Sequence, residues 1–134
     1  MSTRIRTAAL TTVTAAAVVV GGIAASAPAE AKGRVVSAAA HCTTTHTIGA
    51  LKAKSSNGRI EVEFEVDSNR NGQRWTFTLR RNGVLQASGA RLTLAPSGSF
   101  TVARLITNAV GVDRIVAVAK NARTGEVCSA TVRY

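Results

Sequence analysis

The sequence is poor in the residue types from which most recognisable sites are built. Aromatic residues make up 4% of its 134 residues, and it contains two histidines and two cysteines. The shortage of aromatics excludes most aromatic-lined binding surfaces, and so few histidines and cysteines leave little material for a transition-metal site. The hydrophobic fraction of 46% and the charged fraction of 18% are typical of a chain that buries a core. The length allows one domain.

The first 31 residues differ in composition from the rest of the chain. A short segment with two arginines is followed by residues 7–25, which carry no charge and consist mainly of Ala, Val and Thr. Small residues at alternate positions then follow, in the spacing that signal peptidase recognises. We interpret residues 1–29 as a signal peptide cleaved after Ala29, with Ala31 as the alternative. This predicts a secreted or cell-wall-associated protein that keeps no stable membrane span after processing.

The balance of charge is strongly basic. The chain has 17 Lys and Arg against 7 Asp and Glu, and residues 30–134 have 15 against 7, a net charge of +8. Outside a cell this charge favours contact with wall polymers, anionic lipid surfaces or nucleic acid, and it equally serves solubility. The basic residues form no continuous run, and Tyr134 is the only aromatic residue expected to be exposed. Sequence-specific nucleic-acid binding is therefore not predicted.

Cys42 and Cys128 are the only cysteines, and both follow the predicted leader. In an oxidising compartment two such cysteines form an intramolecular disulfide by default. The bridge would close a loop over most of the domain, which in the chain-entropy description stabilises it by about 4–5 kcal/mol. The sequence contains no Cys-x-x-Cys motif, so a redox pair is not indicated.

Beyond residue 31 the sequence alternates between apolar and polar residues, as β-strands do. Residues 60–67 alternate strictly, and their polar face consists of four carboxylates: Glu61, Glu63, Glu65 and Asp67. Residues 74–80 repeat the pattern around Trp75. Further strands are predicted around residue 100 and at 114–121 and 127–133, with weaker patterns at 35–42 and 48–54. Residues 114–121 are apolar on both faces, as in a central strand that is covered on both sides.

The turn at Asn82 and Gly83 allows two strand registers. A two-residue turn would set Leu79 opposite Gln86, whereas a three-residue loop at 81–83 would set Leu79 opposite Leu85. The better apolar match favours the longer loop, with Gly83 at a left-handed bulge position.

Short strands and frequent turn signals over roughly one hundred residues predict an all-β fold, an antiparallel β-sandwich of about seven strands. Residues 46–134 would form the sandwich. Residues 30–45 would be an N-terminal segment that can supply an edge strand.

Five turn motifs follow one another in order: Gly72-x-x-Trp75, Asn82-Gly83, Gly98-Ser99-Phe100, Gly111-x-Asp113 and Thr124-Gly125-Glu126-x-Cys128. Over residues 48–134 this order resembles immunoglobulin-like and fibronectin-type-III-like sandwiches. In particular it resembles small secreted proteins of high-GC Gram-positive bacteria that carry no assigned activity. The resemblance implies that Trp75 matches the tryptophan of the third immunoglobulin strand. The cysteines depart from that pattern, because Cys42 precedes it, and would tie an early edge strand to the last strand. Antibody-type recognition is not implied.

Candidate catalytic and metal-binding residues are few. His41, Cys42 and His46 lie close in sequence but lack a second ligand pair, so no metal site and no cofactor are predicted. Carboxylates along one strand lie about 6.5–7 Å apart and do not converge as glycosidase acids do. The sequence has no Gly-x-Ser-x-Gly elbow and no phosphate-binding glycine loop. No catalytic residue is assigned.

Two arrangements of residues 60–67 and 74–80 give different charge layouts. As hairpin neighbours, the strands would pair Asp67 with Arg74 and Glu61 with Arg80. In the immunoglobulin-like order they lie in opposite sheets, which puts the carboxylates on one side and Arg74 and Arg80 on the other. We favour the second arrangement and predict that the Arg74 and Arg80 side binds polyanions.

These observations predict an exported, non-enzymatic β-sandwich that binds an anionic cell-wall polymer or a protein partner. One alternative is a small secreted enzyme or enzyme inhibitor. Another is a carrier of an apolar small molecule, although the chain lacks the second disulfide of the chromoprotein sandwiches of similar bacteria.

Overall fold

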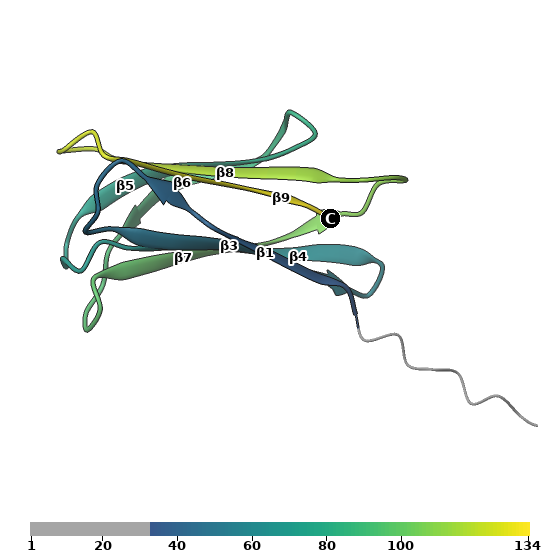
Figure 1. The fold of residues 1–134 in the computed structure, drawn as a ribbon, viewed down its shortest axis with the longest axis horizontal. Coiled ribbons are helices and arrows are strands. Elements are labelled where there is room, and N and C mark those ends of the chain that lie inside the picture. The colour runs from purple at the N-terminus through teal and green to yellow at the C-terminus, as the bar shows by residue number, and fades with distance from the viewer. Residues whose placement is uncertain (1–32) are drawn as a thin grey trace, which may run out of the picture. The chain divides into compact units, whose positions relative to one another are not determined.

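The computed structural model describes residues 33–134, so the predicted signal peptide lies outside the described residues. Within that range the regular elements are strands, and they form two antiparallel sheets packed as a β-sandwich (Figure 1). The strands are β1 (Val35–Ala39), β2 (His41–Cys42), β3 (Ile48–Ser56), β4 (Arg59–Asp67), β5 (Arg74–Arg81), β6 (Val84–Leu92), β7 (Ser99–Thr107), β8 (Arg114–Asn121) and β9 (Val127–Arg133). Residues 33–134 contain no helix long and apolar enough to cross a membrane.

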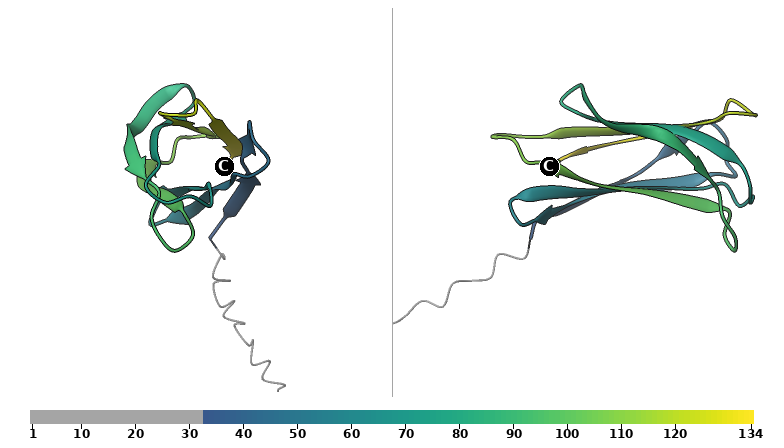
Figure 2. Two further views of the ribbon diagram at one scale, coloured as in Figure 1. Left: turned by 90° about the vertical axis from the view of Figure 1, so that its left-hand side faces the viewer. Right: turned by 180° about the vertical axis from the view of Figure 1, so that it is seen from behind.

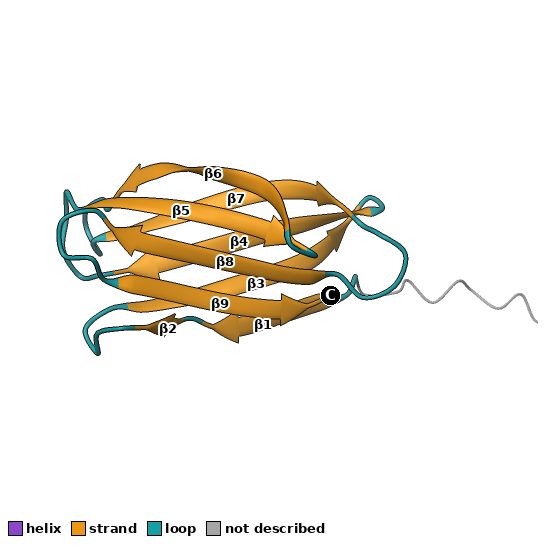
Figure 3. Ribbon diagram, turned by 90° about the horizontal axis from the view of Figure 1, so that it is seen from above, coloured by secondary structure: helices purple, strands orange, loops and turns teal. Residues whose placement is uncertain are grey.

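The order of the strands confirms the immunoglobulin-like arrangement. One sheet has the order β1-β3-β4-β7 and the other has the order β2-β9-β8-β5-β6 (Figure 3). The consecutive strands β4 and β5 lie in opposite sheets, which excludes the hairpin that would pair Asp67 with Arg74. The end-on view shows the two sheets facing each other (Figure 2).

The structure has nine strands where about seven were predicted. One additional strand is β6, which follows the turn at Asn82 and Gly83, and another arises because residues 35–42 do not form one strand. β1 pairs with β3 at the edge of one sheet, and β2 pairs with β9 at the edge of the other. The chain changes sheets at Ala40, whose N–H donates to the carbonyl of Gly49. Residues 35–42 therefore supply an outer strand to each sheet.

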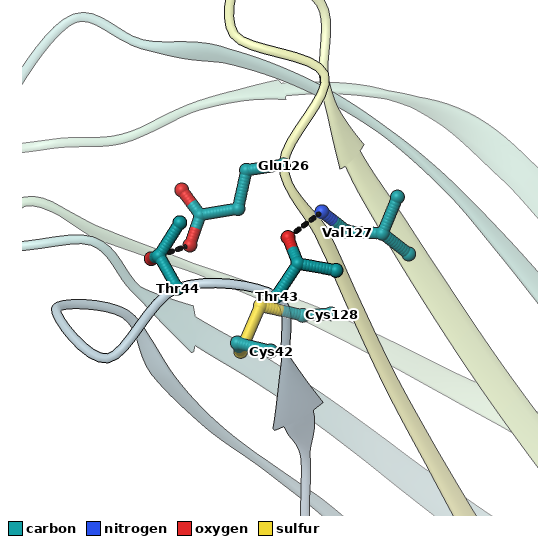
Figure 4. Close-up of a disulfide and its surroundings, with 6 residues drawn as sticks. All are labelled: Cys42, Thr43, Thr44, Glu126, Val127 and Cys128. Carbon is teal, nitrogen blue, oxygen red and sulfur yellow. Dashed lines mark hydrogen bonds between the residues drawn. A yellow bond between two sulfur atoms is a disulfide. The ribbon is translucent and has the colours of Figure 1, made fainter.

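The disulfide is present between β2 and β9, as predicted. Cys42 and Cys128 are directly opposite in the β2–β9 register and are joined through their sulfurs (Figure 4). The Cys128 side chain is fully buried. Beside the bridge, the N–H of Val127 donates to Thr43 Oγ1 at 3.1 Å, and Thr44 Oγ1 donates to the Glu126 carboxylate (Figure 4). The bridge thus ties an early edge strand to the last strand of the chain.

The core consists of the inward-facing residues that the alternation predicted. Trp75, Phe64, Phe77 and Phe100 are all buried, and the rings of Trp75 and Phe100 lie 6.2 Å apart between centroids. The prediction for Tyr134 is wrong, because this residue is 6% exposed. It continues the inward parity of β9, and the guanidinium of Arg34 lies 5.1 Å from the centroid of its ring.

The β5–β6 hairpin differs from the expected three-residue loop. Asn82 and Gly83, with φ of 48° and 83°, form a two-residue turn between the paired residues Arg81 and Val84. Two consecutive left-handed residues suit the right-handed twist of a hairpin better than a longer loop does. A register shift then places Leu79 opposite Ala87. The bulge therefore gives Leu79 an apolar partner, but this partner is Ala87 and not the predicted Leu85, which lies opposite Arg80.

The central position of β8 in its sheet is confirmed, but the strand is not covered on both sides. Ile115, Ala117 and Ala119 face the core and are fully buried. Val116 and Val118 lie on the outer face and are only half-buried.

Candidate functional site

The outer face of the β2-β9-β8-β5-β6 sheet carries cations and no carboxylate on its three central strands. The outward positions of β5, β8 and β9 alternate with the buried ones. Five of these outward positions are basic and exposed: Arg74, Arg80, Arg114, Lys120 and Arg133. The remaining outward residues are Thr, Ser and Val. We call this surface the basic face.

The cations of the basic face gather at its two ends. Arg80, Arg114 and Arg133 lie at one end on three adjacent strands, and Arg114 and Arg133 are directly opposite in the β8–β9 register. Arg74 and Lys120 lie at the other end. The six-residue separation of Arg74 and Arg80 along β5 corresponds to about 20 Å. The face therefore presents two positive ends with a neutral middle.

These five cations have no acidic partner within residues 33–134. The three ion pairs in that range are Lys52–Glu63, Lys54–Glu61 and Arg81–Asp113. Like charges directly opposite each other on a sheet destabilise it, and a neighbouring acid would relieve the repulsion between Arg114 and Arg133. No acidic side chain in residues 33–134 offsets the repulsion between these two arginines.

The outer face of the other sheet holds the predicted row of carboxylates, but the row is partly neutralised. Lys52 and Lys54 on β3 lie opposite Glu63 and Glu61 on β4, with N–O distances of 3.7 Å and 3.2 Å. Glu65 and Asp67 have no ion-pair partner among residues 33–134. The sandwich is therefore basic on one side and of mixed charge on the other, rather than basic and acidic.

Four loops meet at one end of the sandwich, between β2 and β3, β4 and β5, β6 and β7, and β8 and β9 (Figure 3). The β4–β5 and β6–β7 loops are locked together by their backbones. The N–H of Gly72 donates to the Thr93 carbonyl at 2.8 Å, and the N–H of Gln73 donates to Thr93 Oγ1 at 2.9 Å. We call this region the loop end.

Gly98 fixes how closely these two loops approach. Its φ is +78°, and a Cβ built on it would lie 2.2 Å from the backbone nitrogen of Arg70. Only glycine combines this left-handed conformation with so close a backbone contact. The position of Arg70 therefore depends on a glycine in the neighbouring loop.

Two clefts open at the loop end. The first, of about 320 Å³, lies between residues 43–47, the β4–β5 loop and residues 124–126, and its charged lining residues are Arg70 and Glu126. The second, of about 390 Å³, is lined by residues 70–74 with Asn121 and Arg123. We call the second the arginine cleft, because three of its seven lining residues are arginines and none is acidic.

The structure separates the histidines and cysteine that lie close in sequence. His41 is exposed on β2, Cys42 is bonded to Cys128, and His46 lines the first cleft. Within residues 33–134 no three His, Cys, Asp or Glu side chains are grouped as metal ligands. Among residues 33–134 no serine or threonine hydroxyl is hydrogen-bonded to a histidine.

The predicted site residues Arg74 and Arg80 share the basic face but lie at opposite ends of it. Sequence reasoning missed Arg114, Lys120 and Arg133, although their polar parity on 114–120 and 127–133 was available as a signal. Of the three arginines of the arginine cleft it named only Arg74, since Arg70 and Arg123 lie in loops that no periodicity places. No family model and no curated protein matches the sequence of this chain.

Proposed function

We propose that this protein is exported and binds an anionic polymer of the cell surface through its basic face, without catalysing a reaction. The observation that carries the proposal is the set of five exposed cations on β5, β8 and β9 without a carboxylate among them. The disulfide between Cys42 and Cys128 is in keeping with an oxidising, extracellular or cell-wall location.

The layout of the charges suits a polymer better than a small ligand. The two positive ends lie about 20 Å apart along β5, which one small anion cannot span but a chain of anionic groups can. Binding such a chain releases its condensed counterions, so each neutralised charge adds affinity that salt removes. The Thr, Ser and Val residues between the ends carry no opposing charge. Both loop-end clefts are lined mainly by polar residues, which gives no support to a carrier of apolar molecules.

The test is binding to isolated cell wall and to long-chain polyphosphate at low and high salt. We expect salt-reversible binding without turnover. The double substitution Arg74→Gln with Arg80→Gln should weaken binding and flatten the plot of log affinity against log salt by about one to two units. Loss of bound protein through wall hydrolysis would instead support an enzyme.

Two control variants separate the basic face from net charge. Lys52→Gln with Lys54→Gln removes the same two charges from the opposite sheet and should change affinity much less. Glu63→Gln with Glu65→Gln should also have a small effect. Equal weakening by the two cation-removing pairs would show that net charge, and not the basic face, determines binding.

A further inference from the structure

We infer that the arginine cleft is a specific site for a phosphate-type oxyanion, held by Arg70, Arg74, Arg123 and the side-chain amide of Asn121. The inference rests on the proposed function, because it names the group of the polymer that the protein holds most closely. The basic face attracts the chain, and the cleft receives one anionic group of it.

The three arginines that line the cleft come from three different segments. Arg70 comes from the β4–β5 loop, Arg74 begins β5, and Arg123 lies in the β8–β9 turn. None of them takes part in an ion pair within residues 33–134. Guanidinium groups offer several N–H donors in a planar fork that matches the oxygens of phosphate. Three arginines without an acidic partner in residues 33–134 make the lining of the cleft positively charged.

Asn121 provides an independent sign of a ligand. It is 1% exposed, and its Oδ1 accepts hydrogen bonds from the N–H groups of Arg123 at 2.9 Å and Thr124 at 3.1 Å. These two bonds fix the orientation of the amide, because a rotated amide would direct its own N–H groups at two donors. Its Nδ2 is buried and has no hydrogen-bond partner. Because the nitrogen is buried, an oxyanion oxygen would satisfy this donor after a shift of the neighbouring side chains, and buried donors are rarely left unsatisfied.

Gln73 adds a second adaptable amide to the same cleft. Its Oε1 is buried without a partner, while its backbone is held on both sides by Thr93. Rotation of the amide would present the nitrogen as a donor, and no hydrogen bond of the side chain opposes it. The hydrogen bonds between the β4–β5 and β6–β7 loops fix the shape of the cleft in the absence of a ligand. Less conformational entropy is therefore lost when a ligand binds.

The number of donors favours a tetrahedral oxyanion over a carboxylate. A carboxylate has two oxygens, whereas phosphate and sulfate have four, and three guanidiniums with one or two amides can engage all of them. The cleft has a volume of about 390 Å³ and is not an enclosed cavity, so a group attached to a longer chain can enter it from solvent.

The experiment is a titration of the ¹⁵N-labelled protein with inorganic phosphate, followed by the side-chain signals of Asn121 and of the arginines. Parallel titrations use sulfate, acetate and glycerol phosphate, which separate a free anion from an ester and a tetrahedral group from a carboxylate. We expect saturable shifts with phosphate and glycerol phosphate, and much weaker binding of acetate. Absence of saturation with phosphate, or equal binding of acetate, would overturn the inference.

Two substitutions test the site, and one controls for charge. Arg123→Gln should lower phosphate affinity about tenfold, as expected for the loss of a charge-assisted contact. Asn121→Asp keeps the Oδ1 that binds the turn but replaces the donor by a negative oxygen, and should abolish binding. Lys52→Gln removes the same charge from the opposite sheet and should leave phosphate affinity unchanged. If Asn121→Asp fails to fold, the exposed Arg123 carries the test, and unchanged affinity of Arg123→Gln would overturn the site.

Polymer binding measured on the same samples distinguishes the two proposals. Polymer binding that depends on Arg80 without saturable phosphate binding would overturn the cleft and leave the basic face standing. Phosphate binding that depends on Arg123 without polymer binding would support the cleft and contradict the proposed function.

Discussion

At the scale of single residues, Gly98 has the most clearly defined role at the loop end. The β6–β7 loop passes so close to the backbone of Arg70 that a side chain has no room, and the left-handed conformation adds strain for any L residue. The glycine therefore acts on the arginine cleft through the backbone of Arg70, without lining the cleft itself.

The substitution Gly98→Ala should lower the free energy of unfolding by about 2–4 kcal/mol, from the combined cost of a left-handed alanine and of the close contact. Gly58→Ala is the matched control, because Gly58 has a φ of +75° and no atom within 4 Å of an added Cβ. It should cost only about 1 kcal/mol. Denaturant unfolding measures both, and equal losses would show that the contact with Arg70 yields without cost.

The sequence predicted correctly whether a residue is buried or exposed where its position in a strand's alternation alone decides this. Arg74 and Arg80 fall on the polar parity of a strand, and both lie on the basic face. Tyr134 was mispredicted although it continues the inward parity of β9, because a C-terminal residue is not ordinarily expected to be buried. Asn121 could not be recognised as a site residue from the sequence. Its Oδ1 accepts hydrogen bonds from the turn while its Nδ2 has no partner, and this arrangement produces no periodic pattern in the sequence.

At the scale of elements, strands with strict alternation were predicted closely, whereas the division of residues 35–42 and the register of the β5–β6 hairpin were not. β8 and β9 have the predicted bounds, and β4 extends the predicted strand by one residue. The change of sheet at Ala40 within residues 35–42 was missed, because alternation continues through it. The two-residue turn at Asn82 was missed because the bulge that corrects its register depends on the facing strand.

β2 is an element that depends on its covalent bond. It has two residues, and it pairs with β9 only at His41 and Cys42. A strand this short has little stability of its own, so the disulfide, which joins residues 86 positions apart, holds it on the sheet.

Cys42→Ser with Cys128→Ser should lower the free energy of unfolding by roughly 2–5 kcal/mol. Denaturant unfolding of the oxidised protein and of the double variant measures the difference. Hydrogen exchange should show lost protection first around residues 41–43. Wild-type protein treated with reductant serves as the control and should match the variant. An unchanged midpoint would mean that β2 is held without the bridge.

At the scale of the whole molecule, the charge layout follows from strand order. The favoured arrangement correctly separated the β4 carboxylates from Arg74 and Arg80 by placing β4 and β5 in different sheets. The neutralisation of two carboxylates by Lys52 and Lys54 was missed, because it requires the β3–β4 register.

Export makes a prediction about the whole chain. Protein recovered from the culture medium should begin at Glu30 or Lys32 and contain no free thiol. Intact mass spectrometry, with alkylation before and after reduction, measures both properties. A mass that includes residues 1–29, or two alkylated cysteines without reduction, would contradict the prediction.

The change of sheet at Ala40 has a consequence for the order of folding. β1 can join β3 as soon as the next segment of the chain is available, but β2 must wait for β9, which is the last strand to be made. Contacts between such distant segments form late, because closing a long loop has an entropic cost that only the assembled remainder offsets. The side of the sandwich where β1 and β2 lie therefore closes last, after the remaining strands have paired. A chain interrupted before β9 would leave the edge of its second sheet unpaired and open to association with other chains.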